Sequence, residues 1–227
     1  MNGDNGTNDC TVYIDKIARA ASNNPSGSLV ISGSKAGYSN TNWYFDGGYA
    51  PGPLYGNYSW FAAQAGLGVS NALASPSVIY THTTNNYITL GTNVAGYWGA
   101  GSDGGITSFS NYNSFATNGD VKFQGTNNWF IMATVDSWNG VRASYQGGFQ
   151  TWFAATAFGG LNYTNATVGA VVHVYEPTTG GEEDTYTYYR DWALGKPFGI
   201  VAWDALFNNS YGDFVHCAVV GDPFVSR

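Results

Sequence analysis

The sequence predicts an α/β fold in which helices cover both faces of a mostly parallel central sheet. Short, largely apolar runs such as residues 29–31, 129–135 and 168–174 are typical of strands that are buried on both faces. Helical stretches separate these runs, and strands that alternate with helices form parallel sheets. Because the 227 residues show no internal repeat and no boundary in composition, we expect a single domain over 1–227.

The first half of the chain provides two predicted helices and three strands. Asn8 or Asp9 can cap a helix that runs to about Ala21, with Tyr13 and Ile17 on one stripe. Asparagine, proline and glycine then end this helix. Along the rest of this half, aliphatic and aromatic runs between turn residues indicate a strand over 29–31, a helix over 58–66, and strands over 77–80 and 93–98.

The second half begins with the strongest buried-strand signal of the chain, residues 129–135. A helix should follow it, since Phe149, Trp152, Phe153 and Ala157 recur at helical spacing. The acidic residues 182–184 suit the start of a further helix, and Gly195 suits its end. Pro197 suits the first turn of the helix that follows. The remaining predicted elements are a strand over 168–174, helices over 182–194 and 200–207, and a closing strand over 214–220.

Charge and composition exclude several classes of partner. The net charge is −7 and only 10% of the residues are charged, with no run of lysine or arginine. Nucleic acids and anionic membranes select for basic patches, so we expect neither as a partner. The chain has no sustained apolar stretch of 20 residues, so we expect no membrane insertion. Richness in Tyr, Asn, Gly and Thr is typical of a secreted or cell-surface protein. We expect residues 1–9 to be flexible, and no signal peptide is visible in them.

Aromatic side chains on a polar surface indicate ligand binding. Residues 35–57 form a long loop rich in glycine and aromatic residues, and loops of this length in compact domains are usually functional. Exposed aromatic rings stack on sugars, and the candidates for such stacking are Trp43, Tyr44, Tyr49 and Trp138. Half or more of the aromatic residues should nevertheless belong to the core.

Polar residues follow several predicted strands, at the edge of the sheet where ligands of α/β proteins bind. The candidate site consists of Ser102, Asp103, Asp136, Ser137 and Glu176. Three carboxylates at one edge suit a hard cation, so Asp103, Asp136 and Glu176 are candidate Ca²⁺ ligands. Two carboxylates that flank a groove would also suit glycoside hydrolysis. The alternative is that these residues cap loops and helices.

Four motifs resemble a known family. Residues 93–103 resemble the GYxSWGSND stretch of a family of uncharacterised secreted bacterial proteins, which itself resembles gingipain-type, caspase-fold peptidases. Residues 148–150, the GxxGYVxEP-like strand 169–177 and the terminal GDP at 221–223 match in the same order. The resemblance extends over roughly residues 10–223, which is nearly the whole chain. The resemblance implies a caspase-like three-layer sandwich with a mostly parallel sheet.

In such peptidases a catalytic His follows one central strand and a catalytic Cys follows the next. This chain has Ser102-Asp103 and Asp136-Ser137 at those strand ends, so the peptidase dyad is absent. Residues 135–140 of this chain are VDSWNG, whereas its nearer relatives have VSTSxRTF at this place. A serine nucleophile would need His82 or His173 as its base.

The two cysteines leave two alternatives open. Cys10 and Cys217 form one disulfide that ties the chain ends together, or they are two buried thiols. Cys217 does not pair with His216 as nucleophile and base, because neighbours in a strand point to opposite faces.

From these observations we expect an extracellular binding or structural module that has lost the peptidase dyad. Its ligand would be a saccharide or a protein surface, including further copies of itself. No cofactor is required, and Ca²⁺ is the ion that the carboxylates would take. The alternative is a secreted hydrolase of glycans or peptides that uses the strand-end carboxylates or serines.

Overall fold

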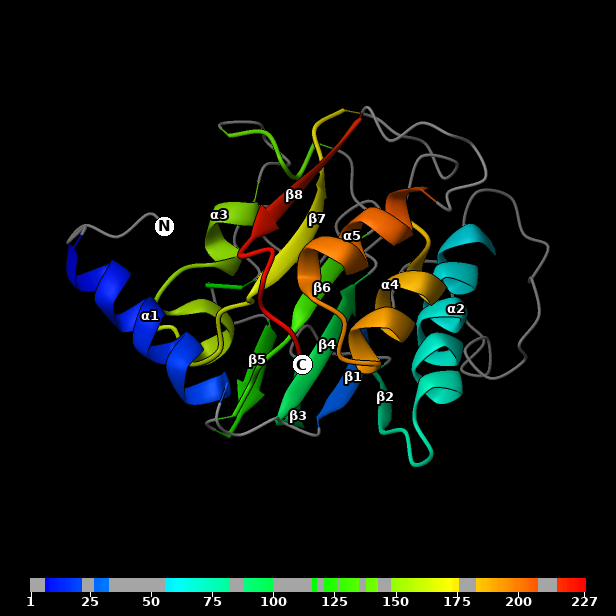
Figure 1. Cartoon of the computed structure of the whole chain (residues 1–227), viewed down its shortest axis with the longest axis horizontal. Coiled ribbons are helices and arrows are strands. Elements are labelled where there is room, and N and C mark those ends of the chain that lie inside the picture. The colour runs from blue at the N-terminus through cyan, green and yellow to red at the C-terminus, as the bar shows by residue number, and fades with distance from the viewer. Residues whose placement is uncertain are drawn as a thin grey trace.

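The computed structural model describes residues 7–21, 27–32, 56–81, 88–99, 116–117, 121–125, 127–134, 138–142, 148–175, 183–207 and 216–227. Its centre is a six-stranded sheet in the order β2-β1-β4-β6-β7-β8 (Figure 1). The strands are β1 (Ser28–Ser32), β2 (Val78–Thr81), β4 (Val94–Gly99), β6 (Ile131–Thr134), β7 (Gly169–His173) and β8 (Cys217–Gly221). All neighbours pair in parallel except β7 and β8, which are antiparallel. The predicted α/β class with a mostly parallel sheet is therefore confirmed.

The three central strands are buried along their whole length. Every residue of β4, β6 and β7 is buried, as their apolar runs predict. The register between β1 and β4 shifts at its start, where Ser28 lies opposite Val94 but Leu29 lies opposite Gly96. Ala95 is therefore an extra residue in β4, a bulge that the sequence pattern does not reveal.

One face of the sheet is covered by α2 (Gly56–Ala72), α4 (Thr185–Ala193) and α5 (Phe198–Phe207) (Figure 1). Aromatic side chains of α4 reach the sheet and donate hydrogen bonds to strand carbonyls. The Tyr188 hydroxyl bonds the Met132 carbonyl at 3.1 Å, and the Trp192 indole bonds the Ala95 carbonyl at 2.7 Å. These rings are fully buried, so each polar tip needs such a partner.

Both predicted C-terminal helices are confirmed, with changed ends. The helix predicted over 182–194 begins at Thr185, because Asp184 caps it by accepting a hydrogen bond from the Thr187 amide at 3.2 Å. Gly195 ends it with a φ of +80°, as expected for a glycine after a helix. The Pro197 carbonyl then accepts the Ile200 and Val201 amides, so Pro197 lies just before α5.

The opposite face carries a small parallel sheet of β3 (Ile88–Thr92) and β5 (Val121–Gln124), and the 3-10 turn η1 (Ala157–Gly159). Four rings pack here with centroids between 5.0 and 5.9 Å apart; they belong to Tyr97, Phe123, Phe130 and Phe158. Neither strand of this small sheet was predicted from the sequence. Near the β8 end of the molecule lie α1 (Thr7–Ala21) and α3 (Phe149–Trp152) (Figure 1).

The helix predicted around Phe149 to Ala157 is wrong in its length. Only Phe149–Trp152 is helical, and the chain then passes through turns into η1. Phe158 adopts a φ of +52°, which a helix does not permit. Elsewhere α2 extends further than the predicted 58–66. No helix among the described residues is long and apolar enough to span a membrane.

Candidate functional site

The strands that precede the predicted strand-end site are neighbours in the sheet. β4, β6 and β7 are consecutive neighbours in the sheet, and Gly99 at the end of β4 lies opposite Thr134 at the end of β6. The candidate residues themselves lie outside the described residues: Ser102, Asp103, Asp136, Ser137, Glu176 and, in the long loop, Trp43, Tyr44 and Tyr49. The roles assigned to them therefore stay predictions.

A buried polar cluster lies beside these strand ends. His173, the last residue of β7, has 0% of its side chain exposed, and its Nε2 lies 3.4 Å from Oε2 of Glu183, which is 1% exposed. Asn139 links the two strands, since its Oδ1 accepts the His173 amide at 2.7 Å and its Nδ2 donates to Oγ1 of Thr134 at 2.8 Å. His173 is thus a core residue with a carboxylate beside it, the more common role of a lone strand histidine.

Trp138, a predicted sugar-stacking residue, packs within the protein. Its ring lies 4.8 Å from that of Tyr175, and the Tyr175 ring lies 4.8 Å from that of His216. Trp138 is half-buried and has a φ of +59°, while its amide donates to the Tyr175 carbonyl at 3.2 Å. The three rings form a row at the carboxyl end of the parallel strands, and Tyr175 is its most exposed member.

The structure favours one of the two alternatives for the cysteines. Cys10 in α1 and Cys217 in β8 are both half-buried thiols, and no disulfide joins them. Among the described residues no group of three His, Cys, Asp or Glu side chains is arranged to hold a metal ion. The carboxylates predicted to bind Ca²⁺ lie outside that part of the chain.

Another cavity of the described structure lies beside β7 and β8. We call it the α1–α3 cavity. It has a volume of about 300 Å³ and is lined by Tyr13, Arg142, Phe149, Gln150, Phe153, Val220, Gly221 and Asp222. Gly221 lies opposite Gly169, the first residue of β7, so this wall of the cavity is at the end of β7 away from the predicted site. Another wall begins nearer that site, since the Phe149 amide donates to the Asn139 carbonyl at 3.2 Å.

Local structure holds the cavity walls in place. Val220 and Val219 point to opposite faces of β8, and Val220 is the one that lines the cavity. Gly221 has a φ of +138°, which only glycine adopts readily, so the chain can turn at the end of β8. The turn is fixed by Asp222, whose Oδ1 accepts the Phe224 amide at 2.9 Å.

The cavity combines apolar walls with polar groups that point to a ligand. Tyr13, Phe149 and Phe153 provide aromatic walls, each at least partly buried. The side chains of Arg142 and Gln150 make no hydrogen bond or ion pair with any residue that the structure describes. Burial, and secondly the charge of Asp222, raise the pKa of Tyr13 to about 12, so its hydroxyl stays protonated at neutral pH. The cavity thus offers donors, a carboxylate acceptor and apolar faces together.

Only partial signals for this cavity are present in the sequence. Tyr13 lies on the predicted stripe of the first helix, Phe149 and Phe153 on the predicted aromatic face, and Asp222 in the terminal GDP motif. Nothing in the sequence places these three segments around one cavity; Gln150 ends the 148–150 motif, and Arg142 belongs to no motif. The face shared by Phe149 and Phe153 was the usable signal, since half-buried aromatic residues beside a strand end indicate a pocket.

Comparisons with known proteins were made at three levels. No family model, no curated protein and no solved structure matches this chain.

Proposed function

We propose that this protein is an extracellular, non-peptidase binding module with a caspase-like fold, and that it binds one saccharide ring in the α1–α3 cavity. The single observation that carries the proposal is that aromatic walls and polar side chains surround one small cavity. Pyranose rings have apolar C–H faces and a rim of hydroxyl groups. They therefore need apolar walls and hydrogen-bonding groups at the same site.

Each wall of the cavity suits one part of a sugar. The rings of Tyr13, Phe149 and Phe153 offer apolar surface for the face of a pyranose. Arg142 and Gln150 can donate to ring hydroxyls, and the Asp222 carboxylate can accept from them. A volume of about 300 Å³ is at the lower end of the range for small-molecule sites, which favours one ring over a long chain.

Absence of peptidase activity is inferred from the strand ends. Residues 100–115 follow β4 and residues 135–137 follow β6, and neither segment contains a histidine or a cysteine. A cysteine peptidase needs its thiol and imidazole in contact, and caspase-type peptidases place them after these strands. The mostly parallel sheet, with α2, α4 and α5 on one face (Figure 1), supports a caspase-like fold, and the low content of charged residues supports secretion.

A hydrolase is the second candidate, favoured by the buried pair of His173 and Glu183. A carboxylate that orients a histidine is the arrangement that activates a serine nucleophile. Complete burial of both side chains favours a structural role. Turnover of nitrophenyl acetate or nitrophenyl glycosides that is abolished by Ser137→Ala would establish the hydrolase and overturn the non-enzymatic proposal.

The proposed function is tested by isothermal titration of the protein with glucose, galactose, N-acetylglucosamine and glucuronic acid. We expect at least one of these sugars to bind. The variants Arg142→Ala and Gln150→Ala should each bind it about fivefold more weakly, because one hydrogen bond contributes about 1 kcal/mol. Both side chains are on the surface of the cavity, so neither change should disturb folding.

The matched control is Gln124→Ala, which removes an exposed glutamine of β5 that does not line the cavity. It should bind as the unmodified protein does. The proposal is wrong if none of the four sugars binds at tens of millimolar, or if Gln150→Ala and Gln124→Ala have the same effect.

A further inference from the structure

Helix α5 has an apolar face that the described structure leaves uncovered. Its inner face is formed by Phe198, Val201, Ala202 and Ala205, all buried against the domain. On the outer side, Ile200, Trp203 and Phe207 recur at i, i+3 and i+7 and are 49%, 66% and 66% exposed. A helix that is apolar on all sides is normally covered on all sides, so this outer stripe requires an explanation.

The exposed stripe continues onto the C-terminal segment. Trp203 and Phe207 are stacked, with ring centroids 6.3 Å apart and ring planes at 16°. The Gly199 amide in the first turn of α5 donates to the Pro223 carbonyl at 2.9 Å, so the C-terminal segment runs beside this turn. The next residue, Phe224, is 86% exposed. We call Ile200, Trp203, Phe207 and Phe224 the α5 surface.

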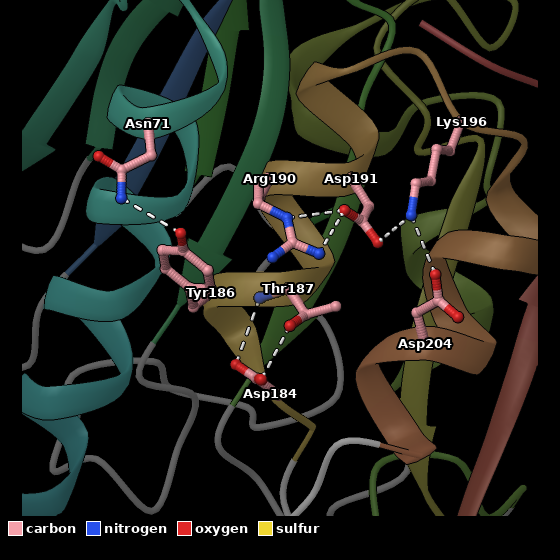
Figure 2. A network of polar contacts seen from close by, with 8 residues as sticks. All are labelled: Asn71, Asp184, Tyr186, Thr187, Arg190, Asp191, Lys196 and Asp204. Atoms are coloured by element: carbon pink, nitrogen blue, oxygen red, sulfur yellow. Dashed lines mark hydrogen bonds and ion pairs between the residues drawn. The ribbon is translucent and has the colours of Figure 1, made fainter.

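The α5 surface carries no uncompensated charge. Asp204 is the acidic residue on α5, and its Oδ2 lies 3.1 Å from Nζ of Lys196 (Figure 2). The chain as a whole has a net charge of −7, so two copies repel one another over most orientations. A neutral apolar surface is where this repulsion is weakest and where burial stabilises association most.

From these observations we infer that the α5 surface is the interface of a two-fold symmetric homodimer, in which α5 packs against α5 of a second copy. Helices associate by packing ridges of side chains into grooves, and a two-fold axis brings the same ridge to both sides. A saccharide fits this surface less well, since Ile200 offers no ring for stacking and the indole N–H of Trp203 is the one hydrogen-bonding group among the four side chains.

The available area is sufficient for a weak dimer. An aromatic side chain buries about 200 Å² when it is fully covered, so the exposed fractions of the three rings amount to about 400 Å² per copy. With Ile200, two copies would bury about 1,000 Å² in total, which is the smallest area expected of a biological interface. We therefore expect a dimer that forms in a concentration-dependent manner.

The test is sedimentation velocity at protein concentrations from about 1 µM to about 500 µM. The mass should rise from the monomer value of 24.2 kDa toward twice that value as the concentration increases. Trp203→Glu should remain monomeric throughout, because it places a charge at the centre of the interface. Since Trp203 is largely exposed in one copy, this variant should fold, which circular dichroism and an unchanged melting temperature would verify.

The matched control is Leu161→Glu, which adds the same charge at a side chain that is 71% exposed and lies outside the α5 surface. It should dimerise as the unmodified protein does. The inference is overturned if the unmodified protein is monomeric at the highest concentration, if Trp203→Glu still dimerises, or if Leu161→Glu abolishes the dimer equally. Because no residue of the α1–α3 cavity belongs to α5, sugar binding by Trp203→Glu reports on the proposed function separately.

Discussion

Asp191 is the central residue of an ion-pair network that joins α4 to α5 (Figure 2). Its side chain is fully buried and interacts with two cations. Oδ1 lies 2.7 Å from a terminal nitrogen of Arg190, and Oδ2 lies 2.8 Å from Nζ of Lys196, which also pairs with Asp204 on α5. Replacing Asp191 with asparagine keeps the shape of the side chain and removes its charge, so it isolates the contribution of the ion pairs.

The expected loss of stability follows from the exposure of the two cations. Hydrogen bonds to charged groups contribute about 1.5–3 kcal/mol each when they are shielded from water. The side chains of Arg190 and Lys196 are 33% and 38% exposed, so water screens them and about 1 kcal/mol for each pair is a better value. We therefore expect Asp191→Asn to lower the free energy of unfolding by about 2 kcal/mol and the melting temperature by about 6 °C.

The effect should depend on pH in a specific direction. Burial alone would raise the pKa of Asp191, but hydrogen bonds from Lys196 and Arg190 outweigh it and lower the pKa below the ordinary value. A carboxyl group with a lowered pKa stabilises the folded state above its unfolded pKa of about 3.9, and this contribution disappears as the pH falls through the folded value. The difference between the two proteins should thus be constant from about pH 5 to pH 8 and should shrink below about pH 4.

Urea denaturation at pH 7 and pH 3, followed by tryptophan fluorescence, measures both effects. The control is Asp204→Asn, because Asp204 is 34% exposed and contacts only the outer side of Lys196. It should cost less than about 1 kcal/mol. If Asp191→Asn costs no more than Asp204→Asn, or if its cost is the same at both pH values, the role assigned to Asp191 is refuted.

Three further predictions concern the core and the strand ends. Gly96→Ala should destabilise the protein by about 1–3 kcal/mol in urea denaturation, because its Cβ would lie 3.1 Å from the ring of Tyr189; an unchanged midpoint would contradict this packing. Asn128→Ala should cost about 2–4 kcal/mol in the same assay, since Asn128 accepts the buried Val94 amide at 2.8 Å and donates to Asn165 at 2.6 Å; a loss below about 1 kcal/mol would show that water replaces it. If the three strand-end carboxylates bind Ca²⁺, EDTA should lower the melting temperature, and no change would exclude a bound cation.

Local patterns were sufficient to predict the central sheet. Residues 129–135 and 168–174 are largely apolar without alternation, and such runs are typical of strands with both faces covered, as in β6 and β7. β5 was missed because it is only four residues long, although Val121 and Phe123 are buried and the residues after each are exposed. A four-residue alternation is too short to distinguish from chance.

The α1–α3 cavity could not be predicted because it is a product of tertiary structure. Tyr13 and Asp222 lie at opposite ends of the sequence, and they meet only after β8 pairs antiparallel with β7. The general rule that ligands bind beyond the carboxyl ends of parallel strands directed attention to the other edge of the sheet. At that edge His173, one of the two histidines that a serine nucleophile would need as its base, lies beside Glu183 in the interior.

The location of ligand binding is tested most directly by heteronuclear NMR. Amide shifts would be recorded while the sugar that binds in the calorimetric titration is added to the ¹⁵N-labelled protein. If the α1–α3 cavity is the site, the shifts should concentrate at Gln150, Val220 and Gly221, and Trp138 and Tyr175 should not change. Shifts concentrated at Trp138 and Tyr175 would place binding at the carboxyl ends of the strands and would contradict the proposed site.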